Sequence, residues 1–231
     1  TVIVPETTEL VHIGFGTING NDDKPFKTRD GGVMRLEYLL KEIDDEMLNK
    51  IKENQKEKEN LNIDEAEAEQ TAKTVALAAV KYGDLSNQAS KDYIFDIDRF
   101  TSFEGNTGPY ILYTIVRIKS ILSKYEAKGG DISALKDAIM PAVNAGQKNL
   151  MLSLAKFNAT IESAYEESAP HKICAYIYEL ANAFNGFYHD TKILSEENEE
   201  LKKSYISLLV LTKEILEACI DMLGFSAPDR M

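Results

Sequence analysis

Cysteine and histidine are scarce in this chain of 231 residues, and this scarcity argues against most metal and redox sites. The two cysteines, Cys174 and Cys219, show neither CxxC nor Cys/His spacing, so they fit neither a zinc site nor a redox pair. We expect both to be buried, reduced thiols. With only three histidines, a His-based metal site is not expected, and no structural metal is predicted.

Long apolar runs are also lacking: no stretch of about 18 apolar residues occurs, which argues against a membrane-spanning helix. The first ten residues, TVIVPETTEL, have neither the basic stretch nor the apolar core of a secretory signal. The sequence therefore predicts a cytoplasmic protein without a membrane partner. It begins without Met, in what reads as a strand, which predicts that it is part of a longer protein.

Positive charge is in deficit, with a formal net charge of -12. A generic nucleic-acid binder, and a DNA binder in particular, is not expected, because neutralising phosphates requires a cationic surface. The deficit is uneven: residues 1–108 hold 13 Lys and Arg against 22 Asp and Glu, whereas residues 109–231 hold 13 against 16. The second part has a local basic segment, opposed only by Glu126, that would suit an RNA of matching shape: Arg117, Lys119, Lys124 and Lys128.

The first 108 residues combine strand and helix patterns. Residues 10–18, LVHIGFGTI, predict a buried strand that runs into a Gly- and Asp-rich loop, and residues 92–98, DYIFDID, predict a short second strand. Apolar spacing predicts helices at about 35–60 and 64–83. The second helix has a capping box, Asp64 with Glu67, and Gly83 as its stop.

A boundary is predicted near SFEGNTGPY, where Gly105 and Gly108 interrupt the pattern and Pro109 suits the first turn of a helix. Beyond it no strand pattern occurs, and the sequence predicts an all-helical bundle over residues 109–231. Its helices are expected at about 110–127, 134–139, 147–156, 158–167, 171–189 and 197–223. The chain is thus predicted to be mostly α-helical, in two domains.

No nucleophilic triad or paired-carboxylate arrangement is visible, and GFG is too short to count as a dinucleotide fingerprint. The stretch KPFKTRDGG carries Lys24, Lys27 and Arg29 beside Thr28 and two glycines. Such a loop suits a polyphosphate, because cations offset its charge and exposed amides donate hydrogen bonds. An ordinary solvated basic loop is the alternative.

Several long runs resemble one family, the arginyl-tRNA synthetases: VHIGFGTINGNDDKPFKTRDGGVMRLE, KYGDLSNQASKDYIFDIDRFTSFEGNTGPYILYTIVRIKSIL, APHKICAYIYELANAFNGFYHD and LGFSAPDRM. The resemblance covers nearly the whole chain. It implies that residues 1–108 are the end of a class I catalytic domain, a partial α/β nucleotide-binding region of Rossmann type. Residues 109–231 would be a helical anticodon-binding domain of the DALR type.

The resemblance implies a parent enzyme that ligates arginine to its tRNA at the expense of ATP. The partners would be arginine tRNA, ATP with Mg²⁺ as its counter-ion, and arginine. Transition-state binding is spread over a whole active site, so this part alone is expected to be inactive. A stand-alone helical RNA-binding or scaffolding module is the rival hypothesis, and a related cysteinyl synthetase is a third. The phosphate loop disfavours the rival, and the long GFGTINGNDDKPFKTRDGG run favours arginine.

In this family the mobile KMSKS loop binds ATP phosphates, and PFKTR at residues 25–29 lies where that motif would be. Thr28 takes the place of the second lysine of the motif. Lys27 or Lys24 would then supply the missing charge, with Arg29 beside them.

HIGF at residues 12–15 looks like the HIGH signature of class I synthetases, but it lacks the final histidine and lies in a predicted strand. It also stands about ten residues before the loop rather than far upstream of it. We interpret it as the strand that leads into the loop. His12, Gly14 and Phe15 would border the adenine of ATP or serve only in packing.

Recognition of RNA bases rests largely on aromatic stacking and on Arg or polar hydrogen bonds to unstacked bases. The helix from Pro109 places Tyr110, Tyr113 and Arg117 on one face, which the resemblance puts beside the anticodon loop. The family also brings the carboxy-terminal Arg230 and Met231 near the anticodon. A later helix adds Tyr178 as a candidate among aromatics whose phenylalanines are expected in the core: Tyr176, Tyr178, Phe184, Phe187 and Tyr188.

Overall fold

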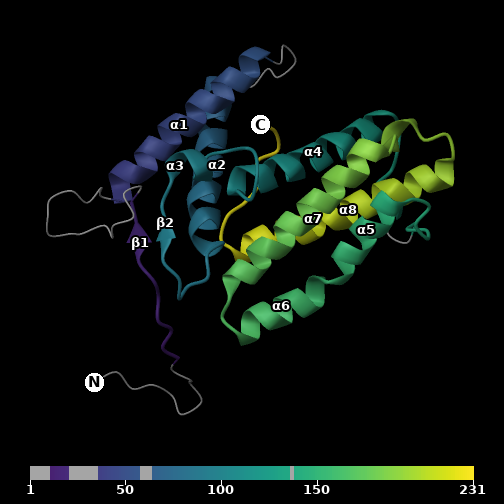
Figure 1. The fold of residues 1–231 in the computed structure, drawn as a ribbon. Coiled ribbons are helices and arrows are strands. Elements are labelled where there is room, and N and C mark those ends of the chain that lie inside the picture. The colour runs from purple at the N-terminus through teal and green to yellow at the C-terminus, as the bar shows by residue number, and fades with distance from the viewer. Residues whose placement is uncertain (1–10, 21–35, 58–63, 136–137) are drawn as a thin grey trace, which may run out of the picture.

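The computed structural model describes residues 11–20, 36–57, 64–135 and 138–231. It is mostly helical, as predicted (Figure 1). The strands in the described ranges are β1 (Ile18–Asn19) and β2 (Tyr93–Ile94), which pair in parallel with Ile18 opposite Tyr93. The short strand predicted at 92–98 is therefore confirmed at Tyr93 and Ile94 only, because residues 97–98 are helical. Two strands of two residues do not by themselves define a Rossmann-type sheet.

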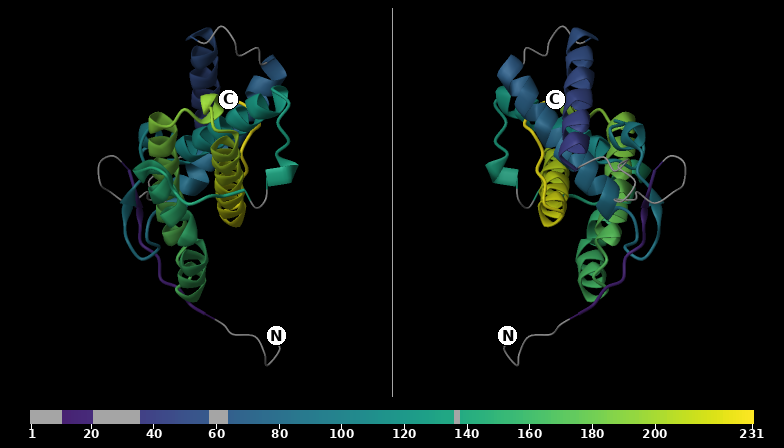
Figure 2. Two further views of the ribbon diagram at one scale, coloured as in Figure 1. Left: turned by 90° about the vertical axis from the view of Figure 1, so that its right-hand side faces the viewer. Right: turned by 90° about the vertical axis from the view of Figure 1, so that its left-hand side faces the viewer.

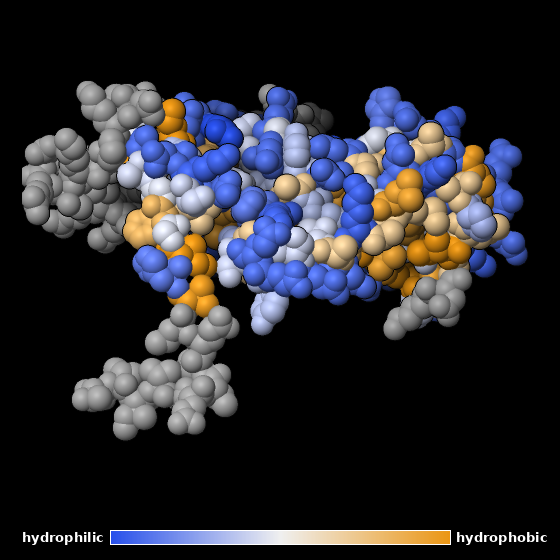
Figure 3. Space-filling view, turned by 60° about the horizontal axis from the view of Figure 1, so that its bottom comes forward, coloured by the Kyte–Doolittle hydropathy of each residue, from blue (hydrophilic) through white to orange (hydrophobic). Residues whose placement is uncertain are grey.

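The buried strand predicted at residues 10–18 is wrong for residues 11–17, which form no strand, and Ile18, which does lie in β1, is exposed. Val11, Ile13 and Phe15 are exposed, and Phe15 is 88% accessible. The physical reason is that β1 pairs over two residues only, so no sheet face extends along residues 11–17 to be covered. Figure 3 shows the resulting orange apolar surface at the left, on the side of the molecule that carries this segment.

Two long helices, α1 (Leu36–Glu57) and α2 (Glu65–Leu85), pack against each other. Asp64 caps α2 as predicted, its side chain accepting a hydrogen bond from the Glu67 amide at 2.8 Å. The alanine-rich face of α2 is buried, which lets neighbouring helices approach closely.

Gly83 is not the stop of α2, because the helix continues to Leu85. A Cβ at position 83 would lie 2.4 Å from the ring of Phe100, which sits at the end of the short helix α3 (Ile97–Phe100). The glycine is therefore required for the approach of this ring and not for ending the helix.

The bundle consists of α4 (Gly108–Ala127), α5 (Ala145–Ala155), α6 (Phe157–Glu166), α7 (Pro170–Asp190) and α8 (Glu199–Met222), within a few residues of the predicted bounds. Pro109 lies in the first turn of α4, and Thr107 caps that helix by accepting from the Tyr110 amide. Figures 1 and 2 show α1 and α2 at one end of the bundle, where α2 packs on α4 and α7.

The helix predicted at 134–139 is wrong where the structure describes it. Only a 3₁₀ turn, η2 (Ser133–Leu135), forms, and residues 138–140 are not helical. Side chains of α8 bind the backbone that a helix would use. Ser207 donates to the Leu135 carbonyl at 2.7 Å, and the Met140 amide donates to Ser204 Oγ at 2.9 Å. A second 3₁₀ turn, η3 (Ile193–Ser195), precedes α8.

The core confirms the expected burial of the phenylalanines and cysteines. Phe184 and Phe187 are fully buried, and Cys174 and Cys219 are free thiols with no exposed surface. Burial raises the pKa of both thiols to about 12, so they are protonated at neutral pH. None of the helices in the described ranges is long and apolar enough to cross a membrane.

Candidate nucleic-acid interface

A groove of about 740 Å³ lies between α4, the end of α7 and the carboxy-terminal tail. It brings together four of the six residues predicted to bind the anticodon: Tyr113, Arg117, Arg230 and Met231. Lys119 and Lys124 of α4 and Tyr188 of α7 also line it. Residues separated by about 120 positions in the sequence thus form one surface that combines aromatic rings with cations.

Arg117 is held between two aromatic rings. Its guanidinium carbon lies 4.8 Å from the centroid of the Tyr113 ring and 5.3 Å from that of Tyr188. One guanidinium nitrogen, Nη1, donates to Asn185 Oδ1 at 2.6 Å. The side chain is half-buried, so its position is fixed from three sides while part of it faces the groove. A guanidinium keeps its charge and offers a planar surface for stacking.

Tyr110 and Tyr178 do not line this groove but pack beside it, with ring centroids 5.7 Å apart in an edge-to-face arrangement. The Tyr110 hydroxyl donates to Asn182 Oδ1 at 2.7 Å and accepts from Asn185 Nδ2 at 2.9 Å. Asn185 therefore connects Tyr110 to Arg117 across the contact between α4 and α7. The geometry makes the two tyrosines supports of the groove wall rather than parts of its surface.

Two residues of the site escaped the sequence analysis. Tyr188 was grouped with the aromatics of its helix, yet it is 41% exposed and stacks near Arg117. Asn185 was not singled out at all. The signal that could have found both is the spacing of Asn182, Asn185 and Tyr188, three residues apart on an otherwise apolar helix face.

The predicted basic segment is divided by the structure. Arg117, Lys119 and Lys124 line the groove, whereas Lys128 lines a second pocket. Lys119 already forms ion pairs within the protein: its Nζ lies 3.5 Å from Glu217 Oε1 and 3.2 Å from Asp229 Oδ1. Lys124 is exposed at the groove. The positive charge offered to a ligand is therefore smaller than the count of cations in the sequence suggests.

Arg230 forms a two-pronged ion pair with Glu67 near the start of α2. Its Nε donates to Glu67 Oε1 at 2.5 Å and its Nη2 donates to Oε2 at 2.7 Å. Hydrogen bonding to this carboxylate raises the pKa of the guanidinium above its usual value. Arg230 thus lines the groove, and Glu67, which lies outside the groove, holds it in place.

The predicted phosphate loop lies outside the described residues, with its Lys24, Lys27, Thr28 and Arg29. His12, Gly14 and Phe15, assigned to the adenine side, lie within them and are exposed. No group of three or more His, Cys, Asp or Glu side chains suited to a metal ion occurs in the described ranges.

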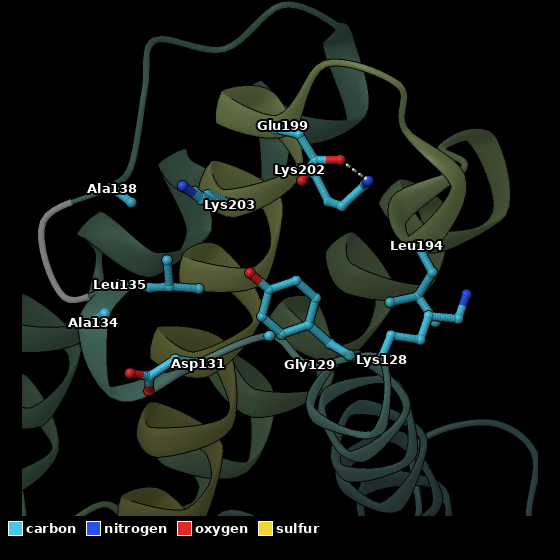
Figure 4. Close-up of a pocket in the computed structure, with 12 residues that line it drawn as sticks. Lys128, Gly129, Asp131, Ala134, Leu135, Ala138, Leu194, Glu199, Lys202 and Lys203 are labelled. Carbon is cyan, nitrogen blue, oxygen red and sulfur yellow. Dashed lines mark hydrogen bonds and ion pairs between the residues drawn. The ribbon is translucent and has the colours of Figure 1, made fainter.

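A second pocket, of about 550 Å³, lies at the far end of α4 between η2, η3 and the start of α8 (Figure 4). Three lysines line it, and one of them, Lys202, pairs with Glu199 at 2.6 Å, the dashed line of Figure 4. Asp131 accepts hydrogen bonds from the amide and hydroxyl of Ser133. The groove at Arg117 differs in holding a guanidinium between two aromatic rings, so we regard it as the better candidate for binding unstacked bases.

Comparison with known families decides the assignment. The family described as the DALR anticodon binding domain matches residues 111–231, and the class I tRNA synthetase (R) catalytic domain matches residues 1–97. The chain belongs to the arginyl-tRNA synthetase family. Its groove residues from Tyr113 onward fall within the DALR match, whereas Glu67 falls within the catalytic match.

Similar proteins agree with the family. The chain is 98% identical over its full length to an arginine–tRNA ligase of Agathobacter rectalis and 53% identical to one of Alkaliphilus oremlandii. It spans 39% and 38% of the length of these curated relatives. Among solved structures, the Thermus thermophilus arginyl-tRNA synthetase matches 95% of this chain with a TM-score of 0.77 at 25% identity, covering 35% of that chain. The Plasmodium falciparum enzyme matches the same share with a TM-score of 0.75 at 26% identity and 35% of its own chain.

Proposed function

We propose that this chain supplies the anticodon-binding part of an arginine–tRNA ligase, and that the groove at Arg117 binds unpaired bases of the anticodon loop of arginine tRNA. The observation that carries the proposal is the guanidinium of Arg117, fixed between the rings of Tyr113 and Tyr188 in an open groove. A base stacked on such an aromatic platform gains about 1–3 kcal/mol.

The acidity of the protein supports recognition of shape over general attraction to phosphate. With a net charge of -12, the surface as a whole repels a polyanion, so attraction is confined to local cations such as Lys124. Single-stranded loops expose both base faces and base edges, and a groove with rings, a guanidinium and a fixed tail can bind both. A regular duplex keeps its base faces stacked, so it offers no base face to such a groove.

The wider assignment follows from the family. We propose a domain boundary at residues 108 and 109, with a Rossmann-type nucleotide-binding part before it and the DALR-type bundle after it. Ligation of arginine to tRNA, with ATP and Mg²⁺ and in the cytoplasm, is the proposed activity of the whole enzyme. The ATP loop of Lys24, Lys27, Thr28 and Arg29 and the adenine contact of His12, Gly14 and Phe15 remain predictions. The match of residues 1–97 to a catalytic domain disfavours a stand-alone RNA-binding module.

A lysine-acetylation footprint tests where the RNA binds. We expect bound arginine tRNA to slow acetylation of Lys124, which lines the groove, several-fold, because the RNA would cover its ammonium group. Lys148 on α5 is exposed and lies outside the groove, so its acetylation rate should not change. Protection of Lys148 with no protection of Lys124 would refute the groove as the RNA site.

A further inference from the structure

The last nine residues form a tail that leaves the bundle and runs beside α2. α8 ends at Met222, and Gly224 adopts a φ of +81°, the left-handed conformation that glycine accepts most readily at the end of a helix. The Phe225 amide donates to the Ile220 carbonyl at 3.1 Å, and the Phe225 ring is buried. Figure 1 shows the yellow tail turning away from α8 and rising alongside α2 to the carboxy terminus.

Two residues of α2 bind the two ends of this tail. Lys81 Nζ donates to the Gly224 carbonyl at 2.5 Å, and Glu67 accepts the paired hydrogen bonds of Arg230. Glu67 and Lys81 are fourteen residues apart, about four helical turns, so they share one face of α2 and lie about 21 Å apart along its axis. The six Cα-to-Cα steps from Gly224 to Arg230 can span about 20 Å when extended. The length of the tail therefore matches the spacing of its two anchors.

α4 holds the tail from the other side. Lys119 Nζ lies 3.2 Å from the Pro228 carbonyl and 3.2 Å from Asp229 Oδ1, and it also pairs with Glu217 of α8. The tail is thus fixed between α2 and α4, and its last residue, Met231, is half-buried where it lines the groove. One wall of the groove is irregular backbone whose position depends on these side chains.

We infer that Glu67 and Lys81 are positioning residues for anticodon recognition: they do not line the groove, but they fix the tail so that Arg230 and Met231 close it. The inference rests on the proposed function of the groove. Both residues lie in the segment that matches the catalytic domain family, whereas the tail lies in the segment that matches the anticodon-binding family. α2 therefore sets the shape of a groove that belongs to the following domain.

The exposure of the Glu67 and Arg230 side chains indicates that their ion pair positions the tail and contributes little to the stability of the whole fold. The Glu67 and Arg230 side chains are 33% and 56% accessible, and exposed ion pairs contribute little to the stability of a fold. The Asp64 cap binds the backbone amide of Glu67, so it persists when the Glu67 side chain is replaced. Loss of the carboxylate is therefore expected to release the tail while the helices stay folded.

The test compares Glu67→Ala with Glu69→Ala in the full chain. Glu69 is an exposed residue on the same helix and carries the same charge, so both variants change the attraction for RNA alike. Two quantities are measured: the rate at which a carboxypeptidase removes Met231, and the ratio of affinities for arginine tRNA and for the same tRNA with an altered anticodon. For Glu67→Ala we expect release to quicken and the affinity ratio to fall, each roughly two- to five-fold, the range of an exposed ion pair. Glu69→Ala should change neither quantity.

A second variant, Lys81→Met, releases the tail at its other end and should change the two quantities in the same direction. The inference is overturned if Glu67→Ala leaves the release of Met231 unchanged, or if release quickens while the affinity ratio stays at the wild-type value. An unmutated chain that binds both tRNAs equally would instead remove the proposed function, and the inference with it. The two failures are therefore distinguishable.

Discussion

Arg117→Ala is expected to weaken binding of arginine tRNA by about 1 to 3 kcal/mol, which is roughly five- to 150-fold in affinity. The substitution removes the charge and the planar group that Tyr113 and Tyr188 hold between them, and it leaves Asn185 Oδ1 without its 2.6 Å donor. Tyr113→Ala should have an effect in the same range, because it removes one of the two rings. Filter binding or fluorescence titration with labelled tRNA measures both.

Two control variants distinguish the groove from charge alone. Arg99→Ala removes the same charge from an exposed position on α3, outside the groove, and should change the affinity little. Arg117→Lys keeps the charge but loses the planar group, so it should recover only part of the affinity. Equal losses for Arg99→Ala and Arg117→Ala would mean that the groove contributes only through net charge. The circular dichroism spectrum of each variant checks that the helices are intact.

Gly108→Ala is expected to lower the free energy of unfolding by about 1–3 kcal/mol, toward the upper end of that range. A Cβ at this position would lie 2.3 Å from the Ala78 carbonyl oxygen and 2.6 Å from its carbon. Both are backbone atoms of α2, so no side chain can turn aside and the two helices must separate. Urea unfolding, with the change in midpoint at constant slope, measures the loss.

Gly186→Ala is the matched control for this substitution. Gly186 lies inside α7, and an added Cβ would meet no atom within 4 Å. Alanine loses less backbone entropy than glycine in a helix, so this variant should be stabilised by roughly 0.5–1 kcal/mol. If both variants shift stability in the same direction, helix propensity rather than the close approach of α2 and α4 governs position 108.

The features that the sequence predicted correctly are local ones. Asp64 precedes an apolar helical pattern, and it caps α2 by accepting a hydrogen bond from the amide of Glu67, three positions on. Tyr113 and Arg117 are four residues apart, which is enough to place them on one face of α4 without knowing its partners. The alternation around Tyr93 likewise located β2.

The features that the sequence did not predict depend on contacts between distant residues. Glu67 and Arg230 are separated by 163 positions, and nothing near either one indicates the other. The burial predicted for residues 10–18 required a longer sheet than the two-residue pairing that forms. The helix predicted at 134–139 is replaced by hydrogen bonds between its backbone and Ser204 and Ser207 of α8. Periodicity shows which side a residue faces, but not what lies opposite it.

The most direct test of the central claim is a titration of the chain with arginine tRNA and with the same tRNA carrying an altered anticodon, at two salt concentrations. Both affinities should fall as salt rises, because part of the binding energy comes from release of counter-ions from phosphates. If the groove reads unpaired bases, the ratio between the two affinities should stay clearly above one at both concentrations. Equal affinities for the two tRNAs at either concentration would contradict anticodon recognition by this chain.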